Sequence, residues 1–152
     1  MLGTLILGCV TVIITMGIQI IAVVMLLRYL IRTLARDDVG IGSFKFDTYV
    51  LSVVLLTLFI GHLVQIWIWA LLFMFLGEFG DFQTAFYHST VNFASLGYGD
   101  IVLSEKWRLL GALEACNGVL MFGLSAGTIL SVMAKLFSHH EIKVPGPHDK
   151  AV

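Results

Sequence analysis

Charged residues are scarce in this chain of 152 residues: only 12% are Asp, Glu, Lys or Arg, whereas 59% are hydrophobic. Soluble globular domains carry roughly twice that share of charge, so water is not the solvent for most of this surface. The formal net charge of -1 gives no reason to expect a nucleic-acid partner. No catalytic constellation, nucleotide-binding loop or cofactor motif occurs either, so we expect neither an enzyme nor a bound cofactor.

Cysteine is also rare in the chain. The two cysteines, Cys9 and Cys116, both lie inside apolar stretches, which predicts buried small side chains rather than a disulfide framework. No linker or low-complexity segment divides the sequence. We therefore expect one membrane domain, in contact with membrane lipid.

Long apolar stretches dominate what is present. The stretches 2–27 and 48–77 contain no charge, and 109–134 contains one, Glu114. Each exceeds the roughly 20 residues that a helix needs to cross a bilayer. The sequence predicts an added N-terminal transmembrane helix within 1–28, a cytoplasmic basic loop at 29–47, an outer helix at 48–77, an inner helix at 107–137 and a flexible cytoplasmic tail at 138–152.

The orientation of these helices follows from the basic residues near their ends, which favour the cytoplasmic side. The loop after the first stretch and the tail after the third are basic, whereas the segment between the second and third stretches is mainly acidic. The basic group comprises Arg28, Arg32, Arg36, Lys45, Lys135, Lys143 and Lys150, and the acidic group Glu78, Asp81, Asp100 and Glu105. We expect a multi-pass protein of a plasma (bacterial inner) membrane, with its N-terminus outside and its C-terminus in the cytoplasm.

The segment between 77 and 107 predicts a short helix that enters the membrane and returns. Asp81 is a candidate N-cap, and no glycine or proline interrupts residues 82–94. A helix of this length measures roughly 20 Å, which is too short to cross the bilayer. Irregular backbone at membrane depth requires burial in protein or a water-filled cavity. We therefore expect a re-entrant pore helix at 82–94.

The residues that follow, Ser95-Leu96-Gly97-Tyr98-Gly99-Asp100, predict a selectivity filter. Glycine adopts positive φ without steric cost, which allows an extended backbone to turn its carbonyls to one side. Four such segments around an axis form rings of oxygens that replace the water shell of K⁺. The expected K⁺ ligands are the carbonyls of Ser95, Leu96, Gly97 and Tyr98, with the Ser95 hydroxyl at the inner end. One chain supplies a quarter of each ring, so the pore requires a homotetramer.

Four residues are expected to support the filter: Gly99, Asp100, Tyr87 and His88. Asp100 would cap the outer mouth and bond back to the pore helix, where Tyr87 and His88 are the candidate partners. The alternative for Asp100 is an acid in a solvated turn. His62 and His88 could tune gating by pH, although a satisfied structural histidine is the commoner role.

Over 82–137 the sequence resembles the potassium-channel pore superfamily, whose pattern Thr-Val-Gly-Tyr-Gly-Asp is matched here by residues 95–100, with Ser95 and Leu96 as departures. The stretch Glu114-Ala115-Cys116-Asn117-Gly118, followed by Ser125-Ala126-Gly127, is similar to the inner helix of bacterial inward rectifiers. That resemblance implies a hinge at Gly118. The spacing of Arg28, Arg32 and Arg36 does not fit a voltage sensor, so we expect background conduction, or gating through pH, lipid or a regulatory partner.

Polar residues recur at helical spacing on the third apolar stretch, including Asn117, Ser125 and Thr128. They predict a cavity lining below the filter, with hydrogen bonding between helices as the alternative. Glu114 is the only acid within a span. It is either functional, as intramembrane acids often are, or a brace behind the pore helix.

Together these features predict an all-α membrane protein with three transmembrane helices, a re-entrant pore helix and a filter loop, assembled as a homotetramer that conducts K⁺ passively. A weakly selective monovalent cation channel and a non-conducting membrane subunit of a larger complex are the alternatives.

Overall fold

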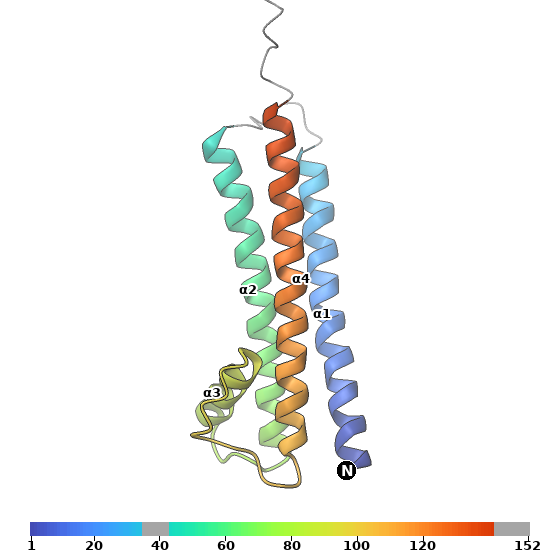
Figure 1. Ribbon diagram of the computed structural model, residues 1–152, viewed down its shortest axis with the longest axis vertical. Helices are drawn as coiled ribbons and strands as arrows, with labels where there is room; N and C mark the ends of the chain where they lie inside the picture. The colour runs from blue at the N-terminus through green and yellow to red at the C-terminus, as the bar shows by residue number, and fades with distance from the viewer. Residues whose placement is uncertain (35–42, 142–152) are drawn as a thin grey trace, which may run out of the picture.

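The computed structural model describes residues 1–34 and 43–141, and this part of the chain is helical without strands. Its helices are α1 (Leu2–Leu34), α2 (Phe44–Phe75), α3 (Phe82–Phe93) and α4 (Arg108–Glu141). Three of them are long and run side by side, while the short α3 lies at one end of the bundle (Figure 1). The N-terminus lies at the same end as α3 (Figure 1).

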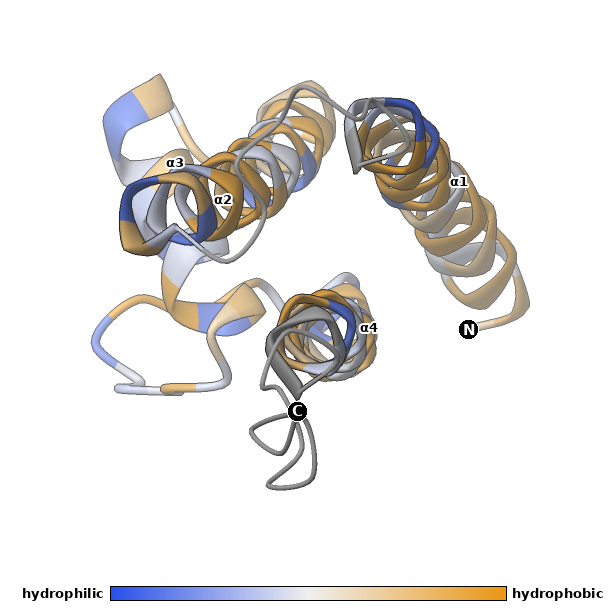
Figure 2. Cartoon of the chain, turned by 90° about the horizontal axis from the view of Figure 1, so that it is seen from above, coloured by the Kyte–Doolittle hydropathy of each residue, from blue (hydrophilic) through white to orange (hydrophobic). Residues whose placement is uncertain are grey.

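The long helices owe their length and packing to apolar composition. α1, α2 and α4 are each long and apolar enough to cross a membrane. Hydrophobic residues cover much of the outward faces of these helices (Figure 2), and large apolar side chains such as Ile13, Leu56 and Leu130 are more than half exposed. Such a surface is stable in lipid, where apolar exposure carries no penalty. The two cysteines are exposed rather than buried, so that expectation was wrong.

The helices extend further than the apolar stretches from which they were predicted. α1 continues to Leu34 and α2 already begins at Phe44, so Arg28, Arg32 and Lys45 lie on helices and not in a loop at 29–47. Charged residues mark the end of the apolar core, but they do not interrupt a helix. Arg36 lies outside the described residues.

α4 also exceeds its predicted bounds of 107–137, because it runs to Glu141. The hydroxyl of Ser138 donates to the carbonyl of Lys135 at 3.0 Å within this last part of the helix. The first residues of the predicted tail at 138–152 are therefore helical, and residues 142–152 lie outside the described part of the chain.

Two apolar clusters hold the bundle together. The first lies in the half remote from α3 and joins α1, α2 and α4 through Val23, Leu26, Leu30, Val50, Val54, Leu58, Val132 and Leu136. The second surrounds α3 and contains Ile66, Trp69, Phe73, Phe93, Leu103, Leu110 and Met121. Large aromatic side chains bury more area than any others, so this second cluster fixes α3 firmly against α2 and α4.

α1 packs against both α2 and α4. Two glycines allow the close approach: Gly8 faces Leu113 of α4, and Gly61 of α2 faces Gln19 of α1. α1 and α3 lie on opposite sides of the bundle (Figure 2). α1 is thus an integral part of the fold, on the side away from α3.

Candidate ion-conduction site

The short helix α3 begins as the sequence predicts. Asp81 is its N-cap, and the Asp81 carboxylate accepts a hydrogen bond from the backbone N–H of Thr84 at 2.8 Å. This bond stabilises the charged form and lowers the pKa of Asp81 below its ordinary value. The helix spans 82–93, one residue less than predicted, with Ala94 as its C-cap.

α3 ends in a Schellman motif that leads directly into the 95–100 segment. The N–H of Ser95 donates to the carbonyl of Asn92 at 2.8 Å, and that of Leu96 donates to the carbonyl of Val91 at 2.9 Å. Ser95 occupies the left-handed position of this motif, with φ of 57°. Glycine is the usual residue there, so a serine at this position does not indicate such a turn.

Every second residue of the 95–99 segment has a positive φ. The values are 57° at Ser95, 57° at Gly97 and 73° at Gly99. Two of these positions are glycines, which tolerate that region. Leu96 and Tyr98, between them, are 54% and 65% exposed. The backbone alternation that a filter loop requires is therefore present in a single subunit.

The Asp100 end of this loop is hydrogen-bonded to α3. The hydroxyl of Tyr87 donates to Oδ2 of Asp100 at 2.8 Å, and Oδ1 of Asp100 accepts from the N–H of Ile101 at 3.0 Å. This is the contact with Tyr87 that the sequence suggested. His88 is placed differently: it is buried, with its ring 5.3 Å from that of Phe73, and its polar neighbour is Asn92. His88 thus makes no hydrogen bond to Asp100 among the described residues, and it lines the space behind the loop together with Gly97 and Gly99.

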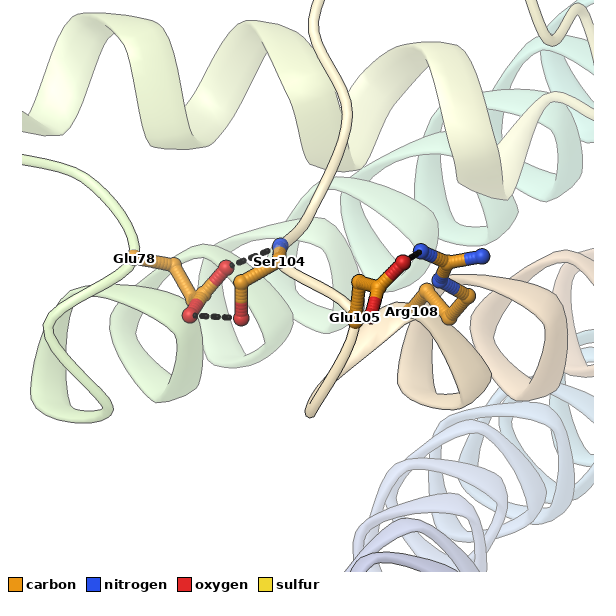
Figure 3. A network of polar contacts seen from close by, with 4 residues as sticks. All are labelled: Glu78, Ser104, Glu105 and Arg108. Atoms are coloured by element: carbon orange, nitrogen blue, oxygen red, sulfur yellow. Dashed lines mark hydrogen bonds and ion pairs between the residues drawn. The ribbon is translucent and has the colours of Figure 1, made fainter.

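A second tie, which the sequence did not indicate, joins the end of α2 to the segment before α4 (Figure 3). The carboxylate of Glu78 accepts from both the backbone N–H of Ser104 at 2.6 Å and its hydroxyl at 2.7 Å. The neighbouring pair of Arg108 and Glu105, at 2.9 Å, is largely exposed and contributes little. The Glu78 contact therefore holds the segment between the 95–100 loop and α4 close to the end of α2.

A cavity of about 470 Å³ lies behind the loop, between α3 and the start of α4. Its lining includes Val91, Asn92, Gly97, Gly99 and Gly111. Because of this space, the loop does not pack tightly against its own subunit. Its outer face, with Leu96 and Tyr98, is likewise uncovered.

Gly118 of α4 has a packing role in the structure. A Cβ atom at this position would collide with the backbone carbonyl of Phe93, the last residue of α3. α4 is a continuous helix through Gly118. The hinge that the resemblance implied stays a prediction, but the close contact by itself explains why glycine stands here.

The residues predicted to line a cavity point into the subunit. Asn117, Ser125 and Thr128 are 0%, 7% and 7% exposed. Asn117 donates to Thr15 of α1 at 3.0 Å, and Ser125 lies 3.0 Å from Nε2 of His62 on α2. The hydroxyl of Thr128 donates to the carbonyl of Leu124 in its own helix. For Asn117 and Ser125 this is the interhelical bonding that the sequence left as the alternative.

Glu114 is fully buried behind α3. Its carboxyl group faces Ser89 and Asn92, and its oxygens have no hydrogen-bond partner among the described residues. This location agrees with a brace behind the short helix.

Comparison with known proteins adds an independent finding. A family model described as ion channel matches residues 49–135, which include α3, the 95–100 loop and most of α2 and α4. Comparisons with curated proteins and with solved structures found no match. The matched segment covers more than half of the chain and contains most of two of the three membrane-spanning helices found in the described residues. The chain therefore belongs to an ion channel family, as a multi-pass integral membrane protein.

Proposed function

We propose that the chain is one subunit of a homotetrameric, potassium-selective channel whose filter is formed by residues 95–98. The observation that carries this proposal is the alternation of positive φ at Ser95, Gly97 and Gly99, directly after a short helix held between two membrane spans. In such a backbone the carbonyls of Ser95, Leu96, Gly97 and Tyr98 are the K⁺ ligands. K⁺ passes when carbonyl oxygens replace its hydration shell.

α3 acts as a re-entrant pore helix in this proposal. Its 12 residues measure about 18 Å, roughly half of a hydrocarbon core of about 30 Å. Its C-terminal end precedes Ser95 and carries a partial negative charge, which favours a cation at the inner end of the filter.

The exposure of the loop supports a symmetric assembly. Leu96 and Tyr98 are exposed in one subunit, and a single loop coordinates an ion from one side only. Four copies around an axis would complete the oxygen rings and cover these side chains. Because Asn117, Ser125 and Thr128 are buried within the subunit, we assign the inner cavity to the open face of α4, where Gly123 and Gly127 have free space around them.

The charge distribution supports an orientation with the N-terminus outside. Arg28, Arg32 and Lys45 lie at the end of the bundle remote from α3, and Lys135 lies near the end of α4. Glu78 and the Asp81 N-cap adjoin α3 at the opposite end. Under the positive-inside rule the filter opens outward in the plasma membrane, which we take to be a bacterial inner membrane, and the C-terminus is cytoplasmic.

Flux from reconstituted liposomes tests the proposal. Under matched gradients, we expect K⁺ efflux to exceed Na⁺ efflux clearly, and native mass measurement should give a tetramer. Gly97→Ala should abolish flux without preventing assembly, because alanine is disfavoured at φ of 57°. Gly80→Ala is the matched control, because Gly80 has open space and no positive φ.

The outcomes separate the alternatives. Equal K⁺ and Na⁺ rates would establish a weakly selective cation channel, the alternative favoured by serine in place of the threonine of the family pattern. A stable monomer without flux would indicate a non-conducting subunit. Full flux in Gly97→Ala would show that ions do not pass through this loop.

A further inference from the structure

α1 lies outside the segment matched by the ion channel family, but it is joined to the matched helices by buried polar contacts. Its buried polar residues form one stripe that faces α2 and α4: Thr4, Thr11, Thr15 and Gln19. The stripe faces the other helices, whereas the remaining faces of α1 are apolar. Such a polar stripe indicates that α1 packs against α2 and α4 in one specific register.

Thr15 is the residue of this stripe that reaches α4. Its Oγ1 accepts from Nδ2 of Asn117 at 3.0 Å, while its own proton can go to the carbonyl of Thr11 at 2.9 Å or of Val12 at 3.0 Å. Both Thr15 and Asn117 are fully buried. Asn117 therefore depends on α1 for this hydrogen bond.

A similar buried polar contact joins α1 to α2. Nε2 of Gln65 donates to Oε1 of Gln19 at 3.0 Å, and Gly61 provides the space for the Gln19 side chain. These two contacts set the height and rotation of α1 relative to both helices that hold α3.

The contact at Asn117 lies next to the start of the filter loop. Gly118, the following residue, touches the backbone carbonyl of Phe93 at the end of α3. Ser95, the first proposed K⁺ ligand, comes two residues after Phe93. A short path thus leads from α1 through Asn117 and Gly118 to the filter, although α1 and α3 lie on opposite sides of the bundle (Figure 2).

We propose that α1 is a positioning element for the filter, and that Thr15 is its positioning residue. By holding Asn117, Thr15 fixes the part of α4 against which α3 ends, and so fixes the inner end of the 95–98 loop. This inference rests on the proposed function, because it concerns the selectivity of that same pore.

The test compares two threonines on the same face of α1 in the full-length protein. Thr15→Val removes the acceptor for Asn117 with little change of shape. Thr11→Val is the matched control, because Thr11 is also buried but its hydroxyl bonds only to the carbonyl of Leu7 in its own helix. Thr15→Ser keeps the hydroxyl and should rescue the function.

The readout is the ratio of K⁺ to Na⁺ flux in liposomes, measured with the amount of tetramer. We expect Thr15→Val to lower the ratio about threefold or more, a change equivalent to an average interhelical hydrogen bond in a membrane protein. Thr11→Val and Thr15→Ser should keep the wild-type ratio. A merely structural role would reduce the amount of tetramer and leave the ratio unchanged, and this result would overturn the proposal.

If Thr15→Val does not assemble, the double variant Thr15→Val/Asn117→Leu is used instead. It removes both polar groups, so no buried amide is left without its partner, and it tests whether Thr15 positions the filter. A lowered ratio in its tetramers supports the positioning role, whereas a wild-type ratio, or failure to assemble, overturns it. A wild-type protein without K⁺ preference would instead refute the proposed function, so the two failures are distinguishable.

Discussion

Gly118→Ala would place a Cβ atom directly against the backbone of another helix. The three atoms nearest to the added Cβ, namely the O, C and Cα atoms of Phe93, all belong to the backbone. No side-chain rotation can relieve this contact, so α3 or α4 has to move by a distance on the order of 1 Å. Overpacking of this kind costs about 1–3 kcal/mol. A cost of about 2 kcal/mol reduces the population of the native helix arrangement roughly 30-fold relative to the displaced arrangement.

The assay for Gly118→Ala combines thermal unfolding of the purified assembly with the ratio of K⁺ to Na⁺ flux. We expect lower stability together with a lower ratio, because the displaced helix end precedes the proposed filter. Gly17→Ala, in the middle of α1, is the control, because its Cβ would meet nothing within 4 Å. If both variants were as stable and selective as the wild type, the packing argument would be refuted. Normal selectivity with altered opening in Gly118→Ala alone would favour a hinge instead.

Three further predictions concern the ties around the loop. Tyr87→Phe removes the donor to Asp100 and should reduce the K⁺ preference in the flux assay, and an unchanged preference would show that this tie is dispensable. Glu78→Gln weakens the two bonds to Ser104 and should lower the free energy of unfolding by about 1 kcal/mol in denaturant titrations, where no change would contradict the anchor. The pKa of Asp81 is lowered in the folded state. The cap therefore stabilises α3 fully when the pH is above the ordinary pKa of a carboxyl group, and this stabilisation is lost as the pH falls through the lowered pKa. The protection factor of the Thr84 amide, its exchange rate compared with that of an unstructured chain at the same pH, should therefore fall at acidic pH, and a protection factor independent of pH would argue against the cap.

Local sequence rules were sufficient for the elements and for part of the site. Asp81 and the uninterrupted residues after it predicted α3 to within one residue, and uncharged length predicted the three spans. The Tyr87–Asp100 contact followed from proximity along the chain. Helix ends were less predictable, because Arg28 and Arg32 are good helix formers beyond the apolar core.

The partners of polar residues on the spans could not be predicted in the same way. Helical spacing showed that Asn117 and Ser125 share a polar face, but it cannot show which neighbour that face meets. The neighbour that Asn117 meets depends on the register of α1. Nothing in the sequence around Thr15 marks this residue as the partner of Asn117. Ser95 was predicted as a K⁺ ligand, but its left-handed conformation was not, because that conformation comes from the Schellman end of α3 and not from a glycine.

The central claim is that four copies of residues 95–98 surround one ion path. An experimental map of the purified assembly in potassium tests it most directly. The account predicts a column of ion density on a fourfold axis, faced by the backbone carbonyls of these residues. Loops that lie apart, with no such column between the subunits, would contradict it.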